Sequence, residues 1–121
     1  MDAKSIAYTL NDCLNQRDFS ALSVMLMDNV TFTGSSNHSI MGKKACIEAW
    51  RTFCRLFPDY QSEFEEIVVN GETVSVRGYS TCSNKRMQGP ALWSGTIKDG
   101  KVYEWRVHHD TTENRVTLGL I

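Results

Sequence analysis

Two Asx-Gly dipeptides, Asn70-Gly71 and Asp99-Gly100, constrain the fold of this chain more than any other feature. Each lies between two runs in which apolar and polar residues alternate, and this combination is the strongest short-range signal for a β-hairpin. The four alternating runs are residues 62–70, 73–82, 88–98 and 101–110. We therefore expect the second half of the chain to form four strands in an antiparallel meander.

The half of the chain before Pro58 has mainly helical periodicity. Apolar side chains recur there at the spacing of one helix face, and Asp2 is placed to cap the first helix. A second, shorter helix is capped by Asp18 or Ser20. One run alternates instead and predicts a strand followed by a polar loop. The principal predicted elements are helices at residues 2–16 and 42–57 and a strand at residues 29–34.

Helices gathered first and strands last indicate an α+β fold. We expect a curved antiparallel β-sheet, a cone or half-barrel, covered by the N-terminal helices and one long helix. Such an arrangement leaves a cone-shaped cavity between the two layers. The 121 residues can close one core and contain no internal repeat, so we expect a single domain spanning residues 1–121. The C-terminal tail is expected to include a helical turn that begins at Asp110 or Thr111.

The charge balance and hydropathy exclude several classes of partner. Thirteen Lys and Arg residues oppose fourteen Asp and Glu residues, so the net charge is −1 and no basic surface for nucleic acid is expected. No apolar run approaches the ~20 residues needed to span a bilayer. The N-terminal residues carry Asp and Asn within their apolar periodicity, unlike a signal peptide. We expect a cytoplasmic protein without a nucleic-acid or membrane partner.

No cofactor and no metal site is expected. The cysteines form no CxxC pair and have no histidines at a metal-binding spacing, so we interpret them as buried, reduced thiols. His108 and His109 are adjacent on a strand, point to opposite faces and cannot bind one ion together. No phosphate-binding loop, dinucleotide motif or nucleophile elbow is present. The four cysteines are Cys13, Cys46, Cys54 and Cys82.

Four local patterns, in order along nearly the whole chain, resemble the nuclear-transport-factor-2-like superfamily, and within it the SnoaL-like polyketide cyclase branch. They are residues 15–19 with 25–30, residues 42–47, residues 57–59 with 70–77, and residues 99–104 with Asp110 and 118–119. The resemblance implies a cystatin-like α+β fold, a deep hydrophobic pocket and a homodimer formed through the sheet. It also implies that Asp110, at the end of the last strand, is a general acid/base in an aldol-type ring closure.

The two faces of the last strand leave an alternative open. Strict alternation places Glu104, Arg106, His108 and Asp110 on one face with Val102. The opposite face carries Tyr103, Trp105, Val107 and His109. The resemblance turns the Asp110 face toward the cavity, whereas hydrophobicity alone turns the opposite face inward. A dimer interface on the outer face would reconcile the two, and we adopt the orientation that the resemblance implies. Cross-strand salt bridges of Glu104 and Arg106 on a solvated face are the structural alternative.

On this interpretation the chain is a cofactor-independent small-molecule enzyme of the cyclase, isomerase or dehydratase type, acting on a flat hydrophobic carbonyl compound. Asp110 would be the catalytic acid/base, assisted by His108, whose unperturbed pKa of about 6.5 suits proton transfer near neutral pH. The predicted substrate-binding residues are Phe32, Trp50, Phe53, Tyr79, Trp93 and Arg106. The alternative is a non-catalytic, dimeric ligand-binding or protein-association domain. A cavity of at least about 300 Å³ that contains Asp110 and His108 would favour the enzyme.

Overall fold

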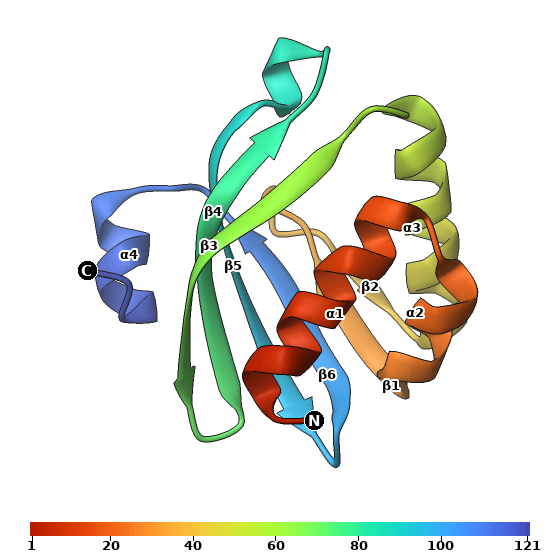
Figure 1. Cartoon of the computed structure of the whole chain (residues 1–121), viewed down its shortest axis with the longest axis horizontal. Helices are drawn as coiled ribbons and strands as arrows, with labels where there is room; N and C mark the ends of the chain where they lie inside the picture. Colours follow the sequence, from red (N-terminus) through yellow and green to blue (C-terminus); the bar gives the residue numbers. More distant parts are fainter.

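The computed structural model describes all residues from 1 to 121 and contains a curved, open six-stranded sheet with helices on both sides (Figure 1). The helices are α1 (Ala3–Gln16), α2 (Phe19–Met25), α3 (Lys43–Leu56) and α4 (Thr112–Leu118), with a 3₁₀ turn η1 (Lys85–Met87). The strands are β1 (Leu26–Thr33), β2 (Ser39–Met41), β3 (Gln61–Asn70), β4 (Thr73–Thr81), β5 (Gly89–Lys98) and β6 (Lys101–His108). The predicted α+β class is therefore confirmed.

The sheet has the strand order β2-β1-β6-β5-β4-β3, and its last four strands form the predicted antiparallel meander. Asp99 and Gly100 both have positive φ, 51° and 75°, as a two-residue hairpin loop of the mirror-image type requires. In the other hairpin the loop is Gly71-Glu72, because Asn70 still pairs with Thr73. β1 runs parallel to β6, which makes the sheet mixed rather than purely antiparallel.

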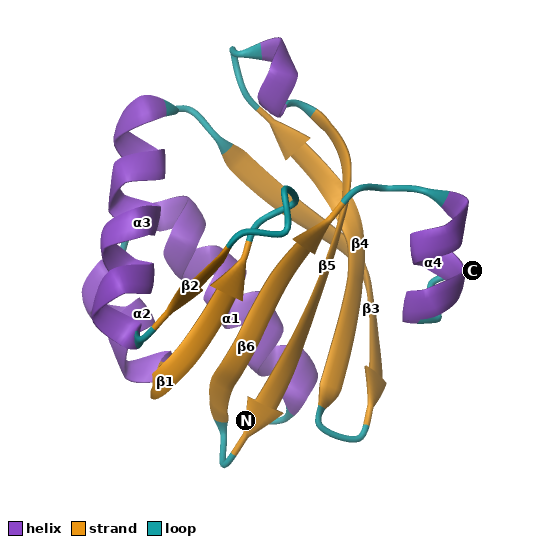
Figure 2. Ribbon diagram, turned by 180° about the vertical axis from the view of Figure 1, so that it is seen from behind, coloured by secondary structure: helices purple, strands orange, loops and turns teal.

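Helices α1 and α3 lie across the concave face of the sheet, whereas α4 lies against the opposite, outer face (Figures 1 and 2). The Asp2 side chain accepts a hydrogen bond from the Ser5 amide at 2.8 Å, which confirms the predicted cap of α1. Asp18, rather than Ser20, caps α2. The core fills the space between the α-helical layer and the sheet. Its largest fully buried side chains include Ile6, Leu10, Leu22, Leu26 and Val30.

Three boundaries differ from the prediction. β1 begins at Leu26, so it follows α2 without a connecting loop. Part of the predicted polar loop forms β2, which pairs with β1. β6 ends at His108, and the tail forms α4, capped by the Thr111 hydroxyl rather than by Asp110. Asp110 therefore lies in the connection between β6 and α4 instead of in the last strand.

A β-bulge in β6 changes which side chains share a face. Ile97 of β5 pairs with Val102, but the preceding Thr96 pairs with Glu104, so Tyr103 is the extra residue. The bulge places Val102 on the same side as Trp105, and both are buried in the core cluster. The strict alternation assumed from the sequence, which grouped Val102 with Glu104, is therefore wrong.

None of the helices combines the length and apolar content that crossing a bilayer would require.

Candidate functional site

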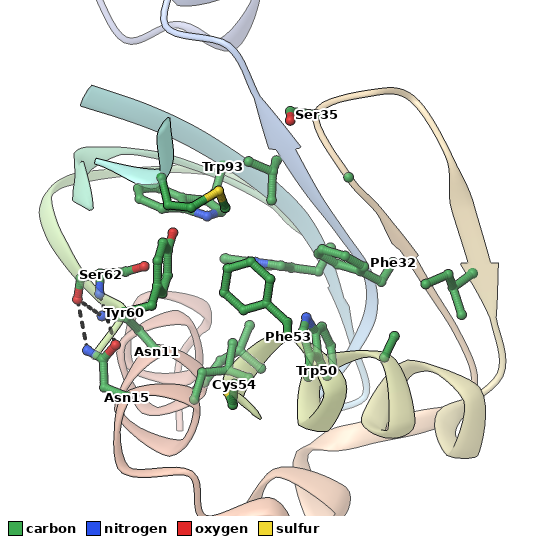
Figure 3. A pocket seen from close by; sticks show the side chains of 18 of the residues that line it. Asn11, Asn15, Phe32, Ser35, Trp50, Phe53, Cys54, Tyr60, Ser62 and Trp93 are labelled. Atoms are coloured by element: carbon green, nitrogen blue, oxygen red, sulfur yellow. Dashed lines mark hydrogen bonds between the residues drawn. The ribbon is translucent and has the colours of Figure 1, made fainter. Parts of the chain in front are cut away.

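A cavity of about 410 Å³ lies between the helical layer and the concave face of the sheet (Figure 3). The helices contribute Leu10, Asn11, Leu14, Asn15, Ala49, Trp50, Phe53 and Cys54. The strands contribute Phe32, Ile40, Ser62, Phe64, Trp93, Trp105 and Val107. Loop residues Gly34, Ser35 and Ser36, together with Met87 of η1, line the cavity at one end of the sheet, and the exposure of Ser35 and Ser36 identifies this end as the mouth.

Two glycines allow indole rings to lie flat along the cavity wall. A Cβ atom on Gly95 would lie 2.7 Å from one ring carbon of Trp105 and would also meet a second ring carbon. A Cβ atom on Gly78 would lie 3.1 Å from the ring of Trp93. Phe64 packs against both rings, with centroid distances of 4.9 Å to Trp93 and 6.2 Å to Trp105. The wall is thus an aromatic surface supported by the backbone of the sheet.

Two asparagines of α1 join this helix to the start of β3. The side-chain amides of Asn11 and Asn15 donate hydrogen bonds to the Ser62 carbonyl at 2.9 and 2.8 Å. The Asn15 side-chain oxygen accepts a bond of 2.9 Å from the Ser62 amide (Figure 3). Sequence reasoning missed both residues. Their signal was the spacing of four residues, which places them on one helix face next to the apolar stripe.

Arg17 is the one charged residue that lines the cavity, and its guanidinium is engaged with the backbone. It donates to five carbonyl oxygens at 2.9–3.3 Å. Two of these belong to the end of α1, and three belong to the segment between α3 and β3. Arg17 therefore fixes these two segments to each other, which is a structural role. The five acceptors are the carbonyls of Leu14, Asn15, Phe57, Pro58 and Tyr60.

The other titratable side chains of the cavity are Cys54 and Tyr60. Burial raises the pKa of the Cys54 thiol, so this group stays protonated near neutral pH. The Tyr60 hydroxyl lies 2.7 Å from the Ser80 hydroxyl, and either group can be the donor. No carboxylate and no imidazole lines the cavity. The cavity therefore offers hydrogen bonds and aromatic surface but no side chain that is a base at neutral pH.

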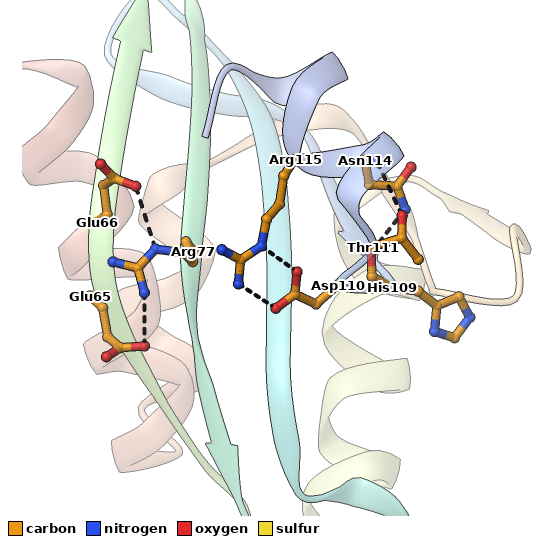
Figure 4. Close-up of polar contacts among 8 residues, drawn as sticks. All are labelled: Glu65, Glu66, Arg77, His109, Asp110, Thr111, Asn114 and Arg115. Atoms are coloured by element: carbon orange, nitrogen blue, oxygen red, sulfur yellow. Dashed lines mark hydrogen bonds and ion pairs between the residues drawn. The ribbon is translucent and has the colours of Figure 1, made fainter. Parts of the chain in front are cut away.

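Asp110 lies on the outer face of the sheet, which corrects the predicted position in the cavity. Its carboxylate accepts two hydrogen bonds from the Arg115 guanidinium, at 2.6 and 2.7 Å (Figure 4). The hydrogen bond from Arg115 holds the pKa of Asp110 below its usual value. The physical reason is the early end of β6, because the chain leaves the sheet before Asp110 and turns into α4.

His108 also lies on the outer face. One ring nitrogen, Nε2, is 2.7 Å from the Ser94 hydroxyl on the neighbouring strand β5. Burial lowers the pKa of His108, and the charge of Arg106 lowers it further, partly opposed by Glu104. The ring is therefore neutral at pH 7 and occupied by a cross-strand hydrogen bond, and it does not contact Asp110 in a hydrogen bond.

The structure separates the eight predicted site residues into two groups of four. Phe32, Trp50, Phe53 and Trp93 line the cavity as expected. Tyr79, Arg106, His108 and Asp110 do not. Arg106 donates to the Asn37 side chain at 3.4 Å, and the Tyr79 side chain is exposed. The orientation of β6 favoured by hydrophobicity, with Trp105 and Val107 inward, is the one that the structure has.

The Asp110–Arg115 pair predicts a pH dependence of stability. Because the pKa of Asp110 is lowered in the folded state, its contribution is present above the unfolded value of 3.8 and is lost as the pH falls through the folded value. We expect wild type to be more stable than Asp110→Asn at pH 7 and the difference to disappear near pH 2. Urea unfolding at pH 7, 4 and 2 measures this difference in the free energy of unfolding. Glu113→Gln, which changes a carboxylate of α4 that has no ion pair, is the control, and an equal loss in both variants would contradict the prediction.

Comparisons with known proteins agree with this fold. The family model described as "SnoaL-like domain" matches residues 7–115. A proposed polyketide cyclase from Sinorhizobium meliloti has a similar structure, with a TM-score of 0.79 and 20% identity over 89% of this chain and 100% of that chain. A proposed polyketide cyclase from Streptomyces antibioticus has a TM-score of 0.76 and 14% identity over 88% and 91% of the two chains.

A cystatin-fold protein from Novosphingobium aromaticivorans has a TM-score of 0.77 and 13% identity over 88% of this chain and 97% of that chain. No curated protein sequence matches the chain. At these identities the structural similarities establish the fold.

Proposed function

The chain belongs to the SnoaL-like domain family, and we propose that it binds one flat, hydrophobic carbonyl compound in the cavity between the helical layer and the concave face of the sheet. The observation that carries this proposal is the volume of about 410 Å³ that remains open although bulky aromatic rings line it. A cavity of this size is in the range of small-molecule sites. A protein-association module would have no need to keep such a volume unfilled.

The lining favours a flat and mostly apolar ligand. Of the 21 lining residues 14 are hydrophobic, and the aromatic ones present ring faces or edges to the cavity. Phe32 and Trp50 meet edge to face at 5.1 Å, so their rings form a corner. Planar ligands gain most from such surfaces, because ring stacking adds about 0.5–1.5 kcal/mol to the burial of apolar area. The ligand is uncharged on this proposal, since no free charged group is available to pair with it.

A second candidate is ring closure of the cyclase type, which the family and the description of two structural neighbours favour. In such a reaction a carbon next to one carbonyl loses a proton, and the resulting enolate carbon attacks a second carbonyl. Because no carboxylate or imidazole lines the cavity, water at the mouth would accept the proton and return one to the alkoxide oxygen formed at the second carbonyl. The chain would fold the substrate, exclude bulk water and donate hydrogen bonds to the carbonyl oxygen, for example from the Tyr60 hydroxyl.

Binding of a flat aromatic ketone tests the proposal. We expect 9-fluorenone to bind with a stoichiometry of one per chain and to change the tryptophan fluorescence, because every tryptophan of the chain lines the cavity. Asp110→Asn and His108→Gln should retain the affinity of wild type, since both residues lie on the outer face. Isothermal titration calorimetry measures the stoichiometry and the affinity. Loss of binding in these two variants, with the fold intact, would contradict the assignment of the site.

The second candidate needs its own assay. A linear aromatic triketone, whose ring closure changes its absorbance, should cyclise faster with the protein than without it. The acceleration should survive Asp110→Asn and fall in Tyr60→Phe. If only Asp110→Asn lost the acceleration, the reaction would have to take place at Asp110 on the outer face, and the cavity would not be the catalytic site.

We also propose that two chains associate through the outer face of the sheet, where Glu104, Arg106 and His108 lie on β6. Glu104 and Arg106 are half-buried and oppositely charged, so each can pair with the other residue of a second copy. Sedimentation should then give a mass twice the 13.7 kDa of one chain. Arg106→Glu should shift the protein toward the monomer, and a single-chain mass at high concentration would overturn this proposal.

A further inference from the structure

All three tryptophans of the chain line the cavity, and their indole N–H groups have no acceptor in the protein. Trp50, Trp93 and Trp105 are 6%, 5% and 2% exposed. None of the side-chain hydrogen bonds of the structure has an indole nitrogen as its donor. Yet no fully buried side-chain nitrogen or oxygen is left without a partner. The three indole nitrogens must therefore each have some accessible surface, and the cavity is the space that these side chains border.

The close-up of the site agrees with this deduction. Figure 3 shows the ring nitrogens of Trp50 and Trp93 on the cavity side of their rings. The ring of Trp105 is held along the wall by Gly95 beneath it and Phe64 beside it, as described above. Its position is fixed by the sheet rather than by a hydrogen bond.

Unpaired N–H groups in a mostly apolar cavity have a chemical consequence. A buried Trp N–H usually finds a partner, and leaving such a donor without an acceptor costs about 1–3 kcal/mol. An indole N–H can donate but cannot accept, so once a bound ligand excludes water only an acceptor on that ligand relieves this cost. A pure hydrocarbon of the same shape would fill the cavity and seal the donors from water without pairing them.

We propose that the cavity recognises its ligand as a hydrogen-bond acceptor, through the N–H groups of Trp50, Trp93 and Trp105. The recognised feature is a hydrogen-bond acceptor at the edge of a flat, mostly apolar ligand, placed to meet one of these N–H groups. This inference rests on the proposed function, because it assigns the chemistry of the ligand that the same cavity holds. It adds specificity, since the aromatic walls accept any flat apolar molecule whereas the donors select those that bear acceptor oxygens.

A matched pair of probes distinguishes binding of any flat apolar molecule from recognition of an acceptor oxygen. 9-Fluorenone and fluorene share one ring skeleton and differ in a carbonyl against a methylene group. In a ¹H–¹⁵N spectrum the protein should show three indole signals, assigned by replacing each tryptophan with phenylalanine. We expect 9-fluorenone to move at least one indole proton downfield relative to fluorene. We also expect the ketone to bind about 3- to 10-fold more tightly, the effect of one hydrogen bond.

Substitution of the responding tryptophan by phenylalanine should reduce the affinity ratio of ketone to hydrocarbon to about one. Tyr103→Phe, which removes an aromatic donor outside the cavity, should leave that ratio unchanged. If a phenylalanine variant fails to fold, biosynthetic replacement of tryptophan by its benzothienyl analogue deletes the N–H group and retains the bicyclic shape. The ratio should again fall to about one.

The outcomes are distinguishable. Equal affinities for the two probes, with the same indole shifts, would overturn the acceptor recognition and leave the binding function standing. Failure of both probes to bind would overturn the proposed function and this inference with it. A ratio that persists in all three phenylalanine variants would assign the preference to another donor and overturn the role of the tryptophans.

Discussion

Gly95→Ala is expected to destabilise the protein by about 1–3 kcal/mol, the usual cost of overpacking a well-packed core. The added Cβ atom would meet the Trp105 ring and would lie 2.9 Å from the Glu104 carbonyl oxygen on the neighbouring strand. Because the sheet backbone cannot retreat, the indole must move into the cavity. Ligand affinity should therefore fall together with stability.

Gly34→Ala is the matched control. Gly34 also lines the cavity, has no positive φ, and a Cβ atom there would meet no atom within 4 Å. Its stability should stay within about 0.5 kcal/mol of wild type, as for surface substitutions in general. Urea unfolding gives both free energies, and 9-fluorenone titration gives both affinities. Equal values for the two variants would mean that Trp105 is not held flat against the strand.

Ala49→Phe is expected to weaken ligand binding on the order of 100-fold, or by about 2.7 kcal/mol. Ala49 lies on α3 and lines the cavity, so the benzyl side chain would occupy the space of the ligand. Stability should be maintained or increased, because filling a cavity adds apolar contacts without opening the core.

The same substitution one turn earlier on α3 provides the control for Ala49→Phe. Ala45 is exposed and does not line the cavity. Ala45→Phe should therefore bind 9-fluorenone as wild type does. If Ala49→Phe also kept its affinity, the ligand would have to bind elsewhere on the molecule, and the cavity would not be the functional site.

The elements that depend on local chemistry could be predicted from the sequence. The two Asx-Gly dipeptides predicted the meander because glycine and Asx are the residues that best tolerate the positive φ found at Gly71, Asp99 and Gly100. The cap by Asp2 and the end of α3 before Pro58 likewise depend on neighbouring residues. Trp50, Phe53, Phe32 and Trp93 were placed in the cavity because their faces of helix or strand are apolar.

The position of the acidic group could not be predicted in the same way. It depends on the bulge at Tyr103 and on the end of β6 at His108, and both arise from pairing with strands distant in the sequence. The partner of Asp110 is Arg115 on α4, a helix expected only as a turn. The hydrophobic pattern of β6 was the better guide, since Trp105 and Val107 face inward although the family resemblance indicated the opposite face.

The three indole donors were also hidden from sequence reasoning. Alternation predicts that a tryptophan faces inward, but it does not predict whether the N–H group finds an acceptor. That outcome depends on Gly78 and Gly95, which let the rings of Trp93 and Trp105 lie flat, and on the open volume above them. Such a site follows from packing in three dimensions rather than from a motif.

The location of a bound aromatic ketone tests the central claim most directly. In crystals soaked with 2-bromo-9-fluorenone, the anomalous signal of bromine marks the position of the ligand. We predict one peak per chain inside the cavity, bordered by Trp50, Phe53 and Trp93. A peak on the outer face beside His108 and Asp110, with the cavity empty, would contradict the account.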